Sequence, residues 1–101
     1  MDVMIYIGTE QAFETVVGAA KPTLVLFAGR WSELGDEIIA KMMLLNFDKV
    51  SIYQVDIDSS DGAEIAEKHS IQVSPTVMLF VAGVLREQAD SLTETMVKLV
   101  S

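Results

Sequence analysis

The residues of this chain that could carry out chemistry are few, and Ser32 and His69 come first. Serine attacks a substrate only when a neighbouring base activates it, and a base such as histidine needs an orienting carboxylate. His69 is the one histidine in the sequence. It is predicted to end a helix, where the helix dipole favours a histidine for structural reasons. A catalytic Ser–His pair is therefore not predicted.

Cysteine chemistry is excluded because the 101 residues contain no cysteine. Disulfides, thiolate metal sites and cysteine nucleophiles are all ruled out. Thiol–disulfide exchange requires a thiolate that attacks sulfur, and a serine hydroxyl cannot form the mixed disulfide. The sequence therefore predicts no thiol–disulfide oxidoreductase activity.

Acidic residues after residue 55 faintly resemble a calcium-binding loop. Asp56, Asp58 and Ser60 have the spacing of oxygen ligands, and Glu67 stands at the twelfth position. The glycine that such a loop needs is displaced by one residue, to Gly62, and a strand rather than a helix is predicted before the loop. We therefore predict no metal site, and we expect no cofactor.

The charge balance limits the partners. The formal net charge is −8, from 15 acidic and 7 basic residues. Nucleic acids and anionic membrane surfaces are bound by clustered Lys and Arg, so we expect neither as a partner. A basic protein partner fits this charge, although solubility alone also explains it. Residues 1–6 lack the basic, apolar pattern of a signal peptide, so a cytoplasmic location is the default expectation.

The elements that must position these residues can be predicted from hydrophobic patterning. The length and the 50% hydrophobic content predict a single domain over residues 1–101. Apolar spacing predicts nine segments: strand 3–7, a helix between Thr9 and Lys21, strand 23–28, a helix from Ser32, strand 51–56, a helix ending at His69, strand 76–81, strand 84–88 and a helix after Ser91. Ala82-Gly83 is predicted as the tight hairpin turn.

Helix faces and caps follow from the same patterns. Thr9 is predicted to cap the first helix, and Asp61-Glu64 and Ser91-Glu94 are predicted as capping boxes of the last two. The predicted inward positions are Phe13, Val16, Val17 and Ala20 in the first helix, Leu34, Ile38, Met42 and Leu45 in the second, and Leu92, Met96, Leu99 and Val100 in the last.

Two motifs in this order of elements resemble the thioredoxin family. The first is the apolar run 24–28 together with the sequence Gly-Arg-Trp-Ser-Glu-Leu-Gly at 29–35. The second is the sequence Val-Ser-Pro-Thr-Val-Met-Leu-Phe at 73–80, which is followed by Gly83. Segment 55–71 is also similar to the third strand and helix of the family. The resemblance implies an α/β, thioredoxin-like fold with the order βαβαβαββα. Its mixed five-stranded sheet would be flanked by helices on both faces, with a cis bond between Ser74 and Pro75.

The departures from the family pattern affect its chemistry. Ser32 and Gly35 stand where the family has its two redox cysteines. Glu33 and Leu34 replace the Gly-Pro between them, and Ala28 replaces an aromatic residue. Leu26 and Gln54 stand in place of the buried aspartate that assists proton transfer and of a nearby lysine. The resemblance therefore implies a redox-inactive member in which His69 lies far from Ser32.

The residues that remain around the former redox motif suggest a role in molecular recognition. The resemblance implies that Trp31, Val73, Ser74 and Pro75 form a surface for a protein or an extended peptide, as in an adaptor or chaperone-like module. Tryptophan is frequent among residues that dominate binding energy, provided that it is exposed. The alternative is that Trp31 packs over its own loop.

Two other functions stay open. Ser32 could serve a glutathione-dependent or other non-redox enzyme, although a helix N-cap is the simpler role for a serine at this position. The six methionines and the high apolar content also allow a structural or assembly subunit, for example a homodimer.

Overall fold

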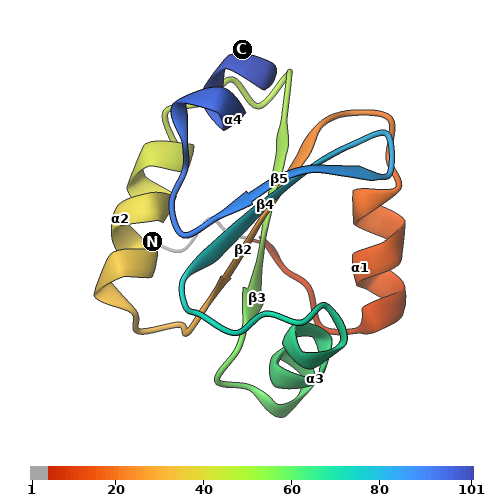
Figure 1. The fold of residues 1–101 in the computed structure, drawn as a ribbon, viewed down its shortest axis with the longest axis vertical. Coiled ribbons are helices and arrows are strands. Elements are labelled where there is room, and N and C mark those ends of the chain that lie inside the picture. Colours follow the sequence, from red (N-terminus) through yellow and green to blue (C-terminus); the bar gives the residue numbers. More distant parts are fainter. Residues whose placement is uncertain (1–4) are drawn as a thin grey trace.

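The computed structural model describes residues 5–101 and confirms the predicted order of elements, βαβαβαββα (Figure 1). The part of the first predicted strand at residues 3 and 4 lies outside the described residues. The elements are β1 (Ile5–Tyr6), α1 (Glu10–Val17), β2 (Thr23–Ala28), α2 (Glu33–Met42), β3 (Ser51–Asp56), α3 (Ser60–Lys68), β4 (Thr76–Val81), β5 (Val84–Ala89) and α4 (Glu94–Leu99).

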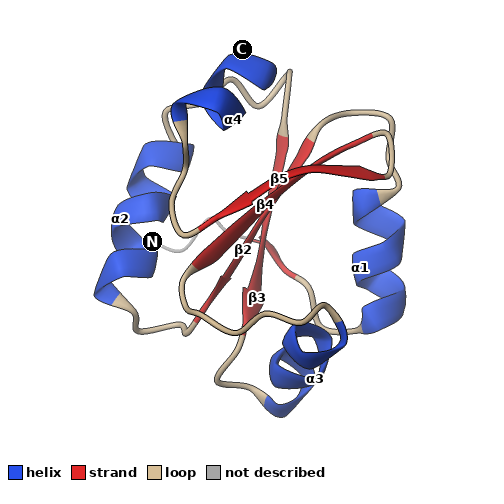
Figure 2. Ribbon diagram, viewed as in Figure 1, coloured by secondary structure: helices blue, strands red, loops and turns tan. Residues whose placement is uncertain are grey.

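The strands form one mixed five-stranded sheet in the order β1-β3-β2-β4-β5. Figure 2 shows the strands in the middle of the molecule, between the helices. Strands β1, β3 and β2 run parallel, whereas β4 is antiparallel to both β2 and β5. Phe27 of β2 pairs with Thr76 of β4. The segment that follows β2 and the segment that precedes β4 therefore meet at one end of the sheet.

Helices cover both faces of the sheet, with α1 and α3 on one side and α2 and α4 on the other (Figure 1). Strand β2 is buried along its whole length because its side chains alternate between the two cores. Val25 and Phe27 pack with α1 and α3, whereas Leu24, Leu26 and Ala28 pack with α2 and α4. This arrangement explains the continuous apolar run of the central strand.

Two of the predicted helix caps are wrong. Helix α3 is capped by Ser59, whose hydroxyl accepts from the Gly62 N–H, and not by Asp61. Helix α4 is capped by Thr93 instead of Ser91. Both capping residues have an extended backbone conformation, and each hydroxyl also donates a hydrogen bond to a residue of the sheet. Ser59 donates to the carbonyl of Asp56 at the end of β3, and Thr93 donates to the Glu87 carboxylate on β5.

Several predicted helix ends and inward positions are also wrong. Helix α1 ends at Val17, so Ala20 lies in an exposed turn rather than on the helix. Helix α2 ends at Met42, and Leu45 packs on the core from the following turn. Leu34 and Leu99 are exposed because other residues form the inward faces of these helices, namely Gly35, Ile38 and Met42 in α2 and Met96 in α4.

The hairpin between β4 and β5 is confirmed. Ala82 and Gly83 have φ angles of 50° and 83°, the left-handed backbone of a two-residue turn whose twist suits a hairpin. Strand β5 continues to Ala89, one residue beyond the predicted end. Among residues 5–101, no helix combines the length and the apolar character that a bilayer crossing requires.

Candidate functional site

The end of the sheet where β2 stops and β4 begins is the candidate site. Trp31 follows β2 by three residues, and Pro75 directly precedes β4. Because Phe27 and Thr76 are paired, the loops that carry Trp31 and Pro75 leave the sheet at the same end. The fold therefore brings together two segments that are more than 40 residues apart in the sequence.

Trp31 is 87% exposed, so the alternative in which it packs over its own loop is wrong. Val73 is 63% exposed, and Ser74 is also exposed. Pro75, which was predicted to form a surface with these residues, is buried. It borders the buried strand β4, so it shapes the loop without presenting its side chain. The Ser74–Pro75 peptide bond is cis.

Leu34 is an exposed apolar residue at this end of the sheet that the sequence predicted to face inward. It is 59% exposed in the first turn of α2. Its helical spacing matches that of Ile38, but the helix begins beyond the end of β2. The signal that could have identified it is the helical spacing of Gly35, Ile38 and Met42, the buried residues of α2, because Gly35 takes the inward position of the first turn.

Ser32 is the N-cap of α2, as predicted. Its Oγ accepts a hydrogen bond from the Gly35 N–H at 3.0 Å. His69 is not available as its base, because the two residues lie at the ends of helices on opposite faces of the sheet (Figure 1). The His69 Nε2 lies 3.0 Å from a carboxylate oxygen of Glu10, and the ring packs on Phe13 with 4.2 Å between centroids. The structural role predicted for His69 is therefore confirmed.

Gly35, which stands where the thioredoxin motif has its second cysteine, has little room for a side chain. A Cβ atom there would lie 3.0 Å from the Ala28 Cβ and 3.3 Å from the Ser32 Oγ. The first turn of α2 thus packs directly against the end of β2. This close approach depends on small residues at both positions 28 and 35.

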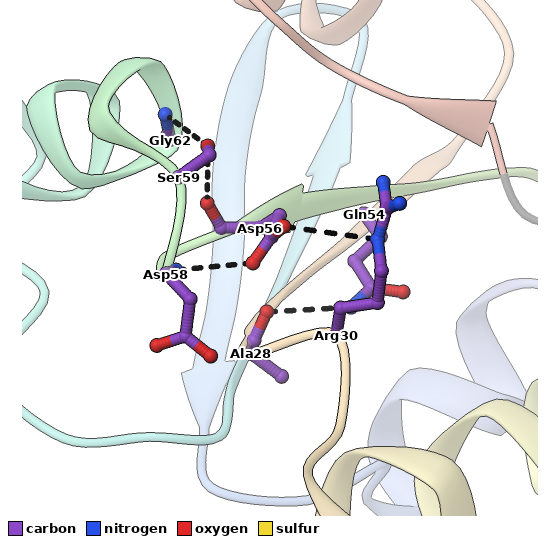
Figure 3. A network of polar contacts seen from close by, with 7 residues as sticks. All are labelled: Ala28, Arg30, Gln54, Asp56, Asp58, Ser59 and Gly62. Atoms are coloured by element: carbon purple, nitrogen blue, oxygen red, sulfur yellow. Dashed lines mark hydrogen bonds and ion pairs between the residues drawn. The ribbon is translucent and has the colours of Figure 1, made fainter.

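The interior beneath the motif is electrically neutral. Leu26 and Gln54 are register partners on β2 and β3, and both are fully or almost fully buried. The Gln54 Nε2 donates to the Ala28 carbonyl at 3.3 Å, while its Oε1 has no hydrogen-bond partner among the described residues (Figure 3). Neither Leu26 nor Gln54 can exchange a proton near neutral pH. These two positions therefore supply no acid or base to the site.

Charged groups surround the end of β3. Arg30 lies 3.8 Å from an Asp56 carboxylate oxygen and 4.4 Å from the centre of the Tyr6 ring. The other Asp56 oxygen accepts from the Asp58 N–H, as Figure 3 shows. The Asp56 carboxylate therefore stabilises the loop that follows β3. Within residues 5–101, no three acidic or histidine side chains gather in a way that could hold a metal ion.

Comparison with known proteins supports the fold. No protein-family model matches the sequence, and a sequence search against curated proteins gives no match. Among solved structures, the chain is similar to thioredoxin from Fasciola hepatica, with 22% identity and a TM-score of 0.76 over 95% of this chain and 94% of that chain. It is also similar to mitochondrial thioredoxin 3 from Saccharomyces cerevisiae, with 15% identity and a TM-score of 0.75 over 95% and 91% of the two chains.

A thioredoxin from Malassezia sympodialis is a third such structure, with 22% identity, a TM-score of 0.75, and coverage of 98% of this chain and 88% of that chain. Identities at this level establish the architecture, and they leave activity to be argued from the site. The β-α order, the sheet order and these likenesses agree. This cysteine-free chain therefore has a thioredoxin-like fold.

Proposed function

We propose that this chain is a redox-inactive module that binds a protein or an extended peptide non-covalently at the Trp31 surface, defined here as Trp31, Leu34, Val73 and Ser74. The observation that carries the proposal is the 87% exposure of Trp31. A large aromatic side chain left in water gains the most from burial against a partner, and tryptophan often dominates the energy of interfaces. Leu34 and Val73 add apolar area at the same end of the sheet.

The backbone of Ser74 also supports an extended partner. Its N–H and C=O make no hydrogen bond with another backbone group of residues 5–101. Exposed and unpaired main-chain groups can pair with an incoming strand, as in other modes of peptide recognition by strand addition. Such pairing would fix the peptide backbone while Trp31 and Val73 contact its side chains.

The proposal is tested by selecting random heptapeptides on the purified protein and measuring their affinity by calorimetry. We expect Trp31→Ala to weaken binding of the selected peptides at least tenfold, which corresponds to about 1.4 kcal/mol. Leu85→Ala is the matched control, because Leu85 is an exposed apolar residue on the edge strand β5. Failure to select any peptide, or equal losses in the two variants, would overturn the proposal.

A further inference from the structure

An open cleft of about 370 Å³ lies beside the Trp31 surface. One wall is helix α3, and the other is the segment that leads from α3 towards β4. Val73 and Ser74 belong both to this cleft and to the Trp31 surface. A peptide bound at that surface can therefore place a side chain in the cleft. The remaining residues that line it are Ile57, Ala63, Ala66, Glu67, Ile71 and Gln72.

The chemistry of the cleft is apolar with one negative charge. Ala66 and Glu67 lie three and four residues after Ala63, so both are neighbours of Ala63 on one face of α3. Ile57 and Ile71 are partly buried and apolar, and they pack on the core. Among the described residues that line the cleft, Glu67 is the one that carries a charge. Within residues 5–101, no ion pair or side-chain hydrogen bond engages its carboxylate.

The neighbouring residues keep this region negative. Glu64 and Lys68 line an adjoining hollow together with Glu67, so one lysine stands against two glutamates on this part of α3. The whole chain has a net charge of −8. A cation that approaches the cleft is thus favoured by the nearest carboxylate and by the overall field.

We propose that the cleft is a subsite for a lysine or arginine side chain of the partner. This inference rests on the proposed function, because the partner must also contact the Trp31 surface. The aliphatic stem would lie against Ala63, Ala66 and Ile71, and the cationic head would meet the Glu67 carboxylate at the rim. Long basic side chains commonly bury their stems in this way while the charge stays near water.

The direct test is a titration with n-butylguanidinium, a minimal mimic of an arginine side chain, followed by amide chemical shifts at constant ionic strength. We expect saturable shifts at Ala63, Glu67 and Val73. Glu67→Gln should weaken binding about three- to fivefold, the size expected of a partly exposed ion pair. Glu14→Gln, which removes one exposed charge from α1, should leave the affinity unchanged. n-Butanol, which lacks the charge, should bind more weakly to the wild-type protein.

The outcomes separate this inference from the proposed function. Trp31 does not line the cleft, so Trp31→Ala should still bind n-butylguanidinium even though it loses the selected peptides. Equal binding of n-butanol and the cation, or no localised shift at all, would overturn the cationic subsite. Peptides selected without a basic residue, and with equal affinity for the wild-type protein and Glu67→Gln, would also overturn it while leaving the Trp31 surface intact.

Discussion

The hydroxyl of Ser32 is committed to the backbone of α2, and this assignment predicts the effect of removing it. Ser32→Ala leaves the Gly35 N–H without its acceptor at the start of the helix. Loss of a serine N-cap costs about 1 kcal/mol of stability. We expect urea denaturation to show a loss of that size in the free energy of unfolding, with peptide binding retained.

Ser32→Asp provides the control for this substitution. Aspartate is an equally good N-cap, and its charge suits a helix N-terminus, so stability should be close to that of the wild-type protein. If Ser32→Ala leaves stability unchanged but abolishes binding, the hydroxyl has a direct role in recognition and the capping assignment is incomplete.

At the scale of elements, the contact between α2 and β2 depends on two small residues. Alanine normally stabilises a helix by about 1 kcal/mol relative to glycine. At position 35, however, the added Cβ would lie 3.0 Å from that of Ala28. Overpacking of this kind costs about 1–3 kcal/mol. We therefore expect Gly35→Ala to lower the free energy of unfolding by about 1 kcal/mol, measured by urea denaturation.

The contact itself is isolated by a double-mutant cycle. Ala28→Gly removes the opposing Cβ, so Gly35→Ala should be less harmful in the Ala28→Gly background, with a coupling of about 0.5–1 kcal/mol. Ala40→Gly, at an exposed position of the same helix, measures helix propensity alone. A gain in stability from Gly35→Ala equal to the loss from Ala40→Gly would show that the crowding is absent.

The sequence predicted the type and order of all nine elements because each has a clear apolar period or a clear turn signal. Its errors lie at helix ends. Ser59, Ser60 and Asp61 are all residue types that can cap α3. Ser59 is the N-cap in the structure, and its hydroxyl also donates a hydrogen bond to the Asp56 carbonyl at the end of β3. Thr93 is the N-cap of α4, and its hydroxyl donates a hydrogen bond to the Glu87 carboxylate on strand β5. Contacts of this kind are tertiary, so local sequence patterns do not show them.

The candidate site was predicted only in part, because it also depends on tertiary contacts. The motifs located Trp31 and the segment around Pro75, but they could not decide between an exposed and a packed tryptophan. Pro75 is buried directly before the buried strand β4, whereas Leu34 is exposed beside Gly35, which takes the inward position in the first turn of α2. The cleft next to Val73 arises from the path of the chain between α3 and β4, which no single segment encodes.

At the scale of the whole molecule, the dominant feature is unbalanced charge. The net charge is −8, and the principal axes measure 33, 27 and 24 Å. At an ionic strength of about 0.01 M the Debye length is about 30 Å, which is comparable to these dimensions, so carboxylates repel one another across most of the molecule. Self-repulsion opposes close contact of two copies as well as the compact state. A homodimer, which the apolar content suggested, stays a prediction that sedimentation can test.

Charge repulsion also predicts that salt stabilises this fold. At about 0.15 M salt the Debye length falls to about 8 Å, so repulsion across the molecule is screened while closer contacts persist. We expect Tm at pH 7 to rise between about 0.01 and 0.15 M NaCl, with a gain in stability of about 1 kcal/mol, comparable to a few surface pairs. The triple variant Glu14→Gln, Asp48→Asn, Asp90→Asn replaces three exposed carboxylates and reduces the net negative charge from −8 to −5. It should melt at a higher temperature than the wild-type protein at low salt and respond less to added salt. A Tm that falls with salt would mean that attractive pairs such as Arg30–Asp56 outweigh the repulsion.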